Sequence, residues 1–447
     1  MQGIDLLREL AERVLMRSPA DETEVLYLGE DSSLTRFANN EIHQNVAETN
    51  LSLQVRVVVS DSVGVASTNS LRDKALDEVV DTAIKLAQVQ PPHPEWPGLP
   101  RPGGVPVPVD GFVHATGSAS PNERASMIER VCRPAIRTGL VASGALQTAS
   151  QELMVANSHD IFVYYPSTFA DFVTVVMGDS GSGYSHQSSA DVTNIDVEAL
   201  GQAAIEKAQR SREPIDLEPG RYDVVLEEYA VEDMVRFISS LGLGGQAYLE
   251  GRSFASHRLG ERVTGEQITL IDNGLDPDRL PLPVDFEGVP RQRVMLIENG
   301  VVRNVVWDHY WANKSKSFHN TGHALPAPNT YGPIPIHLQM APGETPKNEL
   351  VKQIEHGLWV TRFNYTRTVH PMKVIVTGLT RDGTFLIENG EIVAPVKNLR
   401  FTESYLEAFG RVIAVSQERR LLKGWYGASL VPTVALKDFT FTGKTEF

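Results

Sequence analysis

The chain has almost no cysteine, no long apolar run and no excess of positive charge. Cys132 is the single cysteine among 447 residues, so no intrachain disulfide and no thiolate-rich metal site can form. No run of 18 apolar residues occurs, which predicts no membrane-spanning helix. Acidic residues outnumber basic ones, 56 to 41, and this balance disfavours general affinity for nucleic acid or anionic lipid. We therefore expect a cytosolic protein with no nucleic-acid or membrane partner and without a secretory signal core.

A helix–glycine junction lies at 233–251, "DMVRFISSLGLGGQAYLEG". It lacks the residue types that give such a junction a phosphate-binding or catalytic role. Apolar residues recur at steps of three and four over 229–241, which predicts a buried helix face of Ala230, Val231, Met234, Phe237, Ile238 and Leu241. No lysine follows the glycines, which argues against a phosphate loop. No histidine lies on the helix to hold zinc. The glycines 242, 244 and 245 instead suggest a crowded neighbouring backbone.

The first half of the sequence alternates strands and helices. Helices are expected at 3–17, 71–88, 121–138 and 196–211, and strands at 23–29, 33–48, 51–69, 144–158, 161–167 and 169–187. Between them, 90–110 holds eight prolines and predicts an extended connector on the surface, because proline fixes φ and lacks a donor. We assign 1–215 to an α+β domain.

This first half also repeats its landmarks. Ala-Asn at 38–39 recurs 118 residues later at 156–157, and Asp-Ser at 61–62 recurs at 179–180. The pattern "A-I-x-x-A-Q" follows each Asp-Ser, at 83–88 and 204–209. Two strand–strand–helix units with matched landmarks favour an internal duplication over chance similarity. Asp61 and Asp179 are interpreted as turn formers and not as catalytic acids, because aspartate stabilises turns through its own backbone.

The second half, 216–447, reads as mainly antiparallel β structure with few helices, and the fold class is therefore α+β. "LIENGVV" and "LIENGEI" are both typical of hairpins with type I′ turns. One helix beyond 254 is expected, over 402–416. The junction helix 229–241 opens this domain.

Histidines at 309, 319 and 323 gather in one polar segment, "WDHYWANKSKSFHNTGHA". His319 and His323 stand four residues apart, but Asn-Thr-Gly lies between them and predicts a loop. The residue types would allow a zinc site there, but we prefer structural or peptide-contacting roles for these histidines. "GDSGSG" at 178–183 is interpreted as a turn, because it does not match the Gly-x-Ser-x-Gly of a nucleophilic serine.

Taken in order, several segments resemble the TldD/PmbA family, also called TldD/TldE proteases and formerly modulators of DNA gyrase. They are "TRFANNEIHQNV", "VGVASTNSL", "GRYDVVL", "EGRSFASHRLGERV", "YWANKSKSFHNTGHA", "HLQMAPGE", "GLWVTRF" and "DGTFLIENGEIVAPVKNLRFTES". Together they cover essentially the whole chain. The resemblance implies a TldD type with a zinc-binding His-Glu-x-x-x-His motif on the junction helix and a distant cysteine ligand, and a PmbA (TldE) type without them.

In this chain the motif positions hold Arg236, Phe237 and Leu241, and the downstream cysteine is absent. The resemblance therefore implies a PmbA/TldE-type subunit with no metal of its own, while a TldD-type partner supplies zinc and both enclose unfolded peptides. Expected peptide contacts are Arg236, Gly244, Gly245, His309, His319 and His323. A homodimer, a peptide hydrolase or peptide-binding protein acting alone with an unrecognised site, and a protein-binding modulator of DNA gyrase stay open as alternatives.

Overall fold

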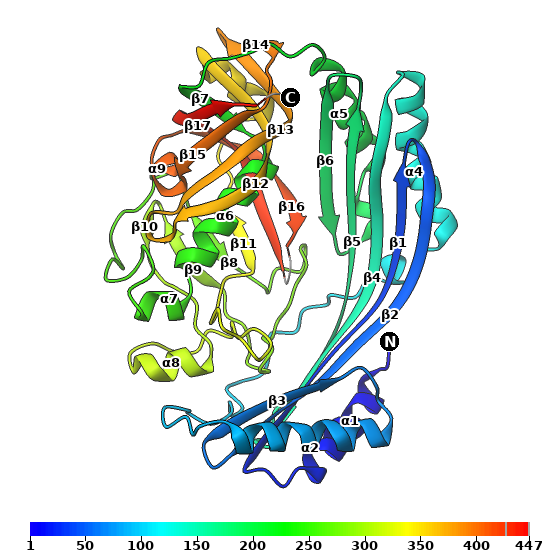
Figure 1. The fold of residues 1–447 in the computed structure, drawn as a ribbon, viewed down its shortest axis with the longest axis vertical. Coiled ribbons are helices and arrows are strands. Elements are labelled where there is room, and N and C mark those ends of the chain that lie inside the picture. The colour runs from blue at the N-terminus through cyan, green and yellow to red at the C-terminus, as the bar shows by residue number, and fades with distance from the viewer. Residues whose placement is uncertain (425–426, 446–447) are drawn as a thin grey trace.

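The computed structural model describes residues 1–424 and 427–445 and arranges them around two β-sheets (Figure 1). Six strands from the first half form one sheet, and eleven strands from the second half form the other. Within the described residues, no strand pairing joins the two sheets. None of the helices in these residues is long and apolar enough to cross a membrane.

The six-stranded sheet is built from two units of the same topology, helix–three strands–helix. The first comprises α1 (Ile4–Arg17), β1 (Glu22–Ala38), β2 (Glu41–Val59), β3 (Ser62–Thr68) and α2 (Asp73–Val89). The second comprises α4 (Pro121–Arg137), β4 (Val141–Asn157), β5 (Phe162–Met177), β6 (Ser182–Ser189) and α5 (Val197–Arg210). The short α3 (His114–Gly117) and a 3₁₀ turn (Val192–Asn194) complete this half. We call the two units the first and second repeats.

The strand order β3-β2-β1-β4-β5-β6 places the repeats back to back, with β1 and β4 antiparallel at the centre. A matched close contact supports the comparison. A Cβ on Gly64 would lie 2.1 Å from the carbonyl oxygen of Ala83, and a Cβ on Gly183 would lie 2.0 Å from that of Ala204. In both repeats the third strand touches the backbone of the following helix, which explains the small residues of "A-I-x-x-A-Q".

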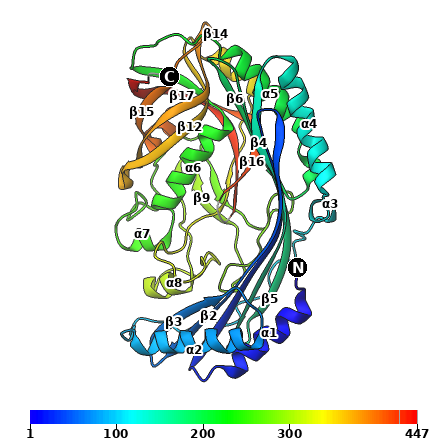
Figure 2. The same cartoon turned by 45° about the vertical axis from the view of Figure 1, so that its right-hand side comes forward.

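All four long helices of the repeats cover one face of this sheet, and the second half of the chain covers the other. Tyr27 and Met154 pack under α1 and α2, and Phe172 packs under α4 and α5. On the opposite face, Leu26 and Leu153 meet Phe286 and other side chains of the second half. Figures 1 and 2 show the second half on the side of the sheet away from α4 and α5.

The second half contains a closed ring of five strands. Its strands are β7 (Arg221–Leu226), β12 (His356–His370), β13 (Ile375–Glu388), β15 (Leu399–Ser404) and β17 (Ala428–Lys444), and β17 closes the ring by pairing with β7. The remaining strands are β8 (Leu270–Asp272), β9 (Val294–Glu298), β10 (Val301–Val302), β11 (His337–Met340), β14 (Glu391–Pro395) and β16 (Val412–Lys423). The helices are α6 (Glu228–Gly242), α7 (Gly245–Leu249), α8 (His309–Ser315) and α9 (Tyr405–Phe409), with 3₁₀ turns at Lys347–Gln353 and Pro371–Lys373.

Both Asn-Gly hairpins are confirmed. Asn299 and Gly300 connect β9 to β10 with φ of 49° and 79°, and Asn389 and Gly390 connect β13 to β14 with φ of 50° and 79°. Two consecutive positive φ values are the signature of the type I′ turn. The α+β class is also confirmed, with few parallel pairings, such as β7 with β12, in the second half.

Several expected boundaries are wrong. The strand expected over 33–48 is a hairpin, because Asn39 and Asn40 adopt positive φ and reverse the chain. Ser60 and Asp61 likewise divide 51–69, and Asp61 thus forms a turn. Conversely, two strands expected to be separate, 161–167 and the start of 169–187, form the single strand β5.

Two helix expectations in the second half are also wrong. The helix expected over 402–416 is helical only over α9, because the β-branched residues after Gly410 pair with β17 as part of β16. Only one helix is expected beyond 254, but a second one, α8, begins at His309. Asp308 caps this helix by accepting a hydrogen bond from the Trp311 amide.

The proline-rich connector forms no helix or strand over 90–110, as expected, but part of it packs against the second half. The Trp96 indole stacks on Tyr310 of α8 at 6.3 Å between ring centroids, and His93 meets the edge of the same ring at 5.3 Å. Trp96 also lies over the Arg56 guanidinium, 5.4 Å away. The connector therefore covers a contact between the first repeat and α8.

Candidate functional site

Helix α6 follows β7 directly and packs against β12 and β17. Its buried face contains Ala230, Val231, Met234, Val235 and Ile238. Two residues expected on that face, Phe237 and Leu241, are only partly buried. The Phe237 ring lies beside Arg236, with the guanidinium 4.8 Å from its centroid, and Leu241 lies in the last turn of the helix.

Arg236 occupies the first position of the expected metal motif and is held by its own helix. Its guanidinium lies 2.8 Å from Asp233 and 3.8 Å from Glu232, and its side chain remains 49% exposed. Asp233 also accepts hydrogen bonds from the hydroxyls of Tyr405 (2.9 Å) and Thr366 (2.8 Å). The arginine is thus positioned by a buried carboxylate that two hydroxyl groups orient.

The residues present at the motif positions do not fit a zinc ion. Zinc in proteins is bound by histidine, cysteine or carboxylate groups. Arg236, Phe237 and Leu241 supply none of these, and a fixed guanidinium charge repels a cation. In the part of the chain that the structure describes, no group of three or more histidine, cysteine, aspartate or glutamate side chains is arranged so that it could hold a metal ion.

Glu232, one turn before Arg236, is a titratable group that sequence reasoning missed. Burial raises its pKa to about 7, and Asp233 adds to this, while Arg236, His186 and a hydrogen bond with Ser429 act in the opposite direction. A carboxyl that titrates near neutrality is a functional-site candidate, although structural networks cause the same shift. No sequence signal marks it, because the shift arises mainly from burial in the folded chain.

A buried network joins the second repeat to the start of α6. Lys207 of α5 donates to Glu227 at 2.7 Å, Lys347 donates to Glu228 at 2.7 Å, and the Trp359 indole donates to Glu227 at 2.7 Å. Burial alone would raise the pKa of Glu227, but Lys207 and Lys347 outweigh it and lower the pKa to about 2. We call these four charged residues the lysine network.

The glycines after α6 are explained by packing. A Cβ on Gly242 would lie 2.1 Å from the Phe254 ring, and one on Gly244 would lie 2.1 Å from the Pro333 carbonyl oxygen. A Cβ on Gly245 would lie 2.4 Å from the Trp307 ring. Gly244 and Gly245 are buried by their own chain. The expected crowding is present, and the peptide contact expected of these two glycines stays a prediction.

The three histidines of the α8 segment have different surroundings. His323 is fully buried, and its ring lies 2.9 Å from Asp272 through Nε2 and 2.9 Å from the Thr321 carbonyl through Nδ1. Its two ring nitrogens are thus used within the fold. His309 starts α8 and is partly buried, and burial lowers its pKa. His319 is exposed.

The structure therefore brings some of the expected residues together and separates others. Gly245 packs on Trp307, which precedes Asp308 and His309, so the glycine turn and the α8 segment are neighbours. Arg236 makes its polar contacts with its own helix and not with this segment.

A second buried group of charges lies between the first repeat and the second half. Arg56 of β2 bonds Glu24 at 2.7 Å and Glu287 at 2.9 Å. Asp285 and Asp308 lie close enough to Glu287 for mutual repulsion. Burial raises the pKa of Glu24 and Asp285 to about 7 and that of Asp308 to about 8. We call these five residues the carboxylate cluster.

A serine–histidine–aspartate arrangement does occur, but its geometry is wrong for nucleophilic catalysis. The Asp171 carboxylate oxygen Oδ1 contacts His186 Nε2 at 2.8 Å and also accepts from the Ser188 hydroxyl at 2.5 Å. A catalytic base must lie between the serine and the aspartate. Here both residues bind the carboxylate directly. In the 178–183 turn, Ser182 donates to Asp382 at 2.8 Å.

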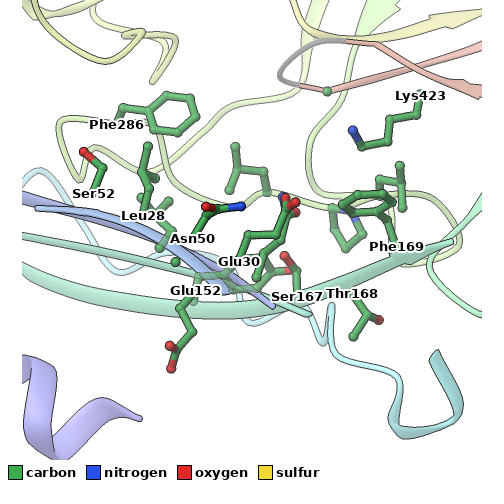
Figure 3. Close-up of a pocket in the computed structure, with 18 of the residues that line it drawn as sticks. Leu28, Glu30, Asn50, Ser52, Glu152, Ser167, Thr168, Phe169, Phe286 and Lys423 are labelled. Atoms are coloured by element: carbon green, nitrogen blue, oxygen red, sulfur yellow. The ribbon is translucent and has the colours of Figure 1, made fainter. Parts of the chain in front are cut away.

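A cavity of about 460 Å³ lies between the six-stranded sheet and the second half (Figure 3). Its floor carries Leu28 and Glu30 of β1, Asn50 and Ser52 of β2, Gln151 of β4, and Ser167 and Phe169 of β5, and its roof carries Leu280, Leu282, Phe286, His337 and Lys423. Sequence reasoning missed this cavity because its lining comes from many separate segments and no short motif marks it.

Comparisons with protein families match most of the chain. Models described as PmbA/TldA metallopeptidase domain 1, central domain and C-terminal domain match residues 23–87, 116–212 and 219–443. The C-terminal match alone spans just over half of the chain.

Curated relatives match over different lengths. A Buchnera aphidicola protein named Metalloprotease TldD homolog is 27% identical over 186 residues, 41% of this chain and 38% of that relative. A Methanothermobacter thermautotrophicus Metalloprotease is 28% identical over 271 residues, 58% of each chain. The chain thus covers less than two thirds of both. A Haemophilus influenzae Metalloprotease PmbA homolog is 23% identical over 437 residues, 93% of this chain and 91% of that relative.

Solved structures match over nearly the whole chain and show the same fold. TldE from Thermococcus kodakarensis superimposes with a TM-score of 0.89 at 21% identity, covering 98% of this chain and all of that one. A Thermotoga maritima protein, named as a candidate modulator of a DNA gyrase, superimposes with a TM-score of 0.86 at 17% identity, with coverage of 98% and 100%.

Proposed function

Because the chain belongs to the PmbA/TldD metallopeptidase family, we propose that it is the metal-free subunit of a cytosolic two-chain metalloprotease that degrades or processes unfolded peptides. A TldD-type paralogue would supply zinc. This chain would supply part of the wall that encloses the peptide and would control access to the partner's metal.

One observation carries the proposal: α6 packs against β12 and β17, and the positions where the resemblance puts the metal motif hold no zinc ligand. Arg236 stands where the resemblance puts the first histidine, and Asp233 holds it by an ion pair of 2.8 Å. Phe237 and Leu241 complete the site with apolar groups. An arginine fixed in this way is a poor neighbour for a divalent cation, so the chain's own chemistry argues against a hydrolytic metal on α6.

The half-exposed Arg236 suits a role at the peptide wall. Its guanidinium can donate to the backbone carbonyls or carboxylate of a bound chain, because Asp233 uses only part of its five donors. Recognition through backbone groups would favour extended peptides over particular side chains. His319, exposed beside α8, is a second candidate contact.

The test compares the purified chain alone with the same chain co-expressed with a TldD-type paralogue from its own source. We expect no stoichiometric zinc by elemental analysis in the isolated chain, one zinc per complex, and cleavage of an unfolded fluorescent peptide only by the complex. Arg236→Met in this chain should leave zinc content unchanged and raise the KM for peptide. Chelator-resistant cleavage by the isolated chain would contradict the proposal and favour a hydrolase acting alone.

Two further outcomes distinguish the remaining alternatives. A stable homodimer that forms no complex with the paralogue would favour a homodimeric peptide-binding protein. Specific retention of purified gyrase, without any complex with the paralogue, would favour the gyrase modulator.

A further inference from the structure

The cavity between the two halves of the chain contains charges of both signs, contributed from opposite sides. Glu30 rises from β1 on the floor, and Lys423 reaches in from the end of β16 on the roof (Figure 3). In the described part of the chain no ion pair joins them to each other or to a third residue. The Glu30 carboxylate accepts from the Gln151 amide at 2.8 Å, which orients it without neutralising its charge.

Lys423 is positioned on both its backbone and its side chain. Its amide donates to the Ser188 hydroxyl at 2.8 Å, and its ammonium lies 4.2 Å from the centroid of the Phe169 ring. An aromatic face holds a cation without consuming its hydrogen-bond donors. Asp171 lies close enough to Lys423 for an electrostatic interaction with its ammonium group, but the Asp171 carboxylate is already bound by His186 and Ser188.

Glu152 and His337, which also belong to the lining, do not compete for a ligand. Glu152 points away from the cavity in Figure 3 and accepts from the Gln2 and Gly3 amides and the Tyr164 hydroxyl. Burial lowers the pKa of His337 to about 3, so its ring is neutral. One anion and one cation therefore set the electrostatics of the cavity.

The remaining lining separates into an apolar end and a polar floor. Leu28, Leu282 and Phe286 form the apolar end beside the Leu26–Leu153 contact. β1 and β4 are paired on both sides along the floor, whereas β2 pairs with β3 only from Leu53 onward and β5 pairs with β6 only from Ala170 onward. The charges of a ligand in this cavity must match those of Lys423 and Glu30.

We propose that this cavity binds a short peptide with free termini, with the terminal carboxylate at Lys423, the terminal ammonium at Glu30 and an apolar first side chain against Leu28 and Phe286. A cavity of 460 Å³ lies within the range of small-molecule sites. The inference rests on the proposed function, because it identifies peptides of cleavage-product size as the ligand of a site within this chain.

The experiment is isothermal titration calorimetry of the full-length isolated chain with Leu-Gly-Gly, its N-acetylated form and its C-terminal amide. We expect the free tripeptide to bind and each blocking group to weaken binding about tenfold, the effect of roughly 1.4 kcal/mol. In Lys423→Met, amidation should cost less than about twofold, and in Glu30→Gln, acetylation should cost less than about twofold. Exposed-site controls Lys437→Met and Glu41→Gln should behave as wild type.

Two results would overturn the inference: no binding of the free tripeptide at millimolar concentration, or blocking penalties that persist unchanged in Lys423→Met and Glu30→Gln. Circular dichroism melting of each variant confirms that the fold is intact. The test needs neither zinc nor a partner. If the two-chain complex cleaves peptides but the isolated chain binds none, the inference is wrong and the proposed function stands. If the isolated chain binds the tripeptide but no active complex forms, the proposed function is wrong and the cavity still binds peptides.

Discussion

The two repeats share one topology but contact the second half through buried charges of different balance. The first repeat meets it at the carboxylate cluster, where Arg56 pairs with two of four carboxyl groups and burial raises the pKa of three of the four. The second repeat meets the second half at the lysine network, where two lysines form ion pairs with Glu227 and Glu228. There the lysines lower the pKa of both glutamates despite burial.

This difference shows that a repeated topology does not determine the chemistry of an interface. The contacts common to both repeats are backbone ones, such as those of Gly64 and Gly183 with their helices. The buried charges depend on what the second half presents to each repeat. The lysine network thus contains as many lysines as glutamates, whereas the carboxylate cluster contains four carboxyl groups and one arginine.

The largest expected effect comes from removing the positive charge of the cluster. Arg56→Met should lower the free energy of unfolding by about 3–5 kcal/mol at pH 8, because it leaves Glu24 and Glu287 buried without a partner. The matched variant Lys207→Met should cost about 1.5 kcal/mol, because Glu227 keeps Lys347 and Trp359. Urea titrations of both variants measure this, and equal losses would contradict the comparison.

The backbone contacts common to the repeats should respond alike. Gly64→Ala and Gly183→Ala should each destabilise by about 1–3 kcal/mol, because the new Cβ meets a helix carbonyl at 2.1 or 2.0 Å. Gly103→Ala, whose Cβ would come no nearer than 3.9 Å to its surroundings, is the control and should change little. Thermal melts report the shifts. A large loss in one repeat and none in the other would break the structural equivalence.

The two interfaces should respond to pH in opposite directions. Glu24, Asp285 and Asp308 bind protons more tightly in the folded state, so their stabilising contribution is complete below their ordinary pKa near 4. It declines as the pH rises toward 7–8 and is then constant. Glu227 has a lowered pKa, so its contribution is complete above its ordinary pKa and is lost as the pH falls toward 2.

Hydrogen exchange between pH 5 and 9, corrected for the intrinsic rate, measures this contrast. Amides at 285–289 should lose protection as the pH rises to 8, with a change on the order of 1 kcal/mol in opening free energy. Amides at 227–231, measured in a Glu232→Gln variant to remove the neighbouring carboxyl whose pKa is about 7, should not change over that range. Asp308→Asn should reduce the pH dependence at 285–289, and an unchanged dependence would show that other groups cause it.

The smallest effect concerns the connector that covers the first interface. Trp96→Ala should destabilise by about 0.5–2 kcal/mol, because the indole stacks on Tyr310 and lies over Arg56. Lys314→Met removes the exposed ion pair with Glu95 in the same region and should cause no measurable change. Chemical denaturation of both variants compares them. Equal effects would mean that the indole does not shield the arginine.

Much of the fold could be predicted from local patterns. The helices at 4–17, 73–89 and 121–137 lie within two residues of their expected bounds, because each has a strong apolar period. The predicted boundaries were wrong where backbone angles or a pairing strand override the local sequence pattern. Positive φ at Asn39 turned an expected strand into a hairpin, and pairing with β17 turned the end of an expected helix into strand. The first depends on a single backbone angle, and the second on a partner strand distant in sequence.

The candidate site could be predicted only in part. The residue types on α6 and the crowding around its glycines follow from sequence. The carboxylate cluster and the cavity do not, because Arg56 and Glu287 lie 231 residues apart and the cavity lining comes from both halves.

The sequence by itself determined which chemical groups each element can offer: an arginine, a phenylalanine and a leucine at the motif positions of α6 cannot bind zinc in any packing. Only the tertiary structure decided which charges are buried together, which lysine faces a carboxylate across a cavity and which carboxyl groups titrate near neutrality. The physical reason is that ligand identity is a property of a side chain, whereas desolvation and Coulomb interaction are properties of its neighbours in space.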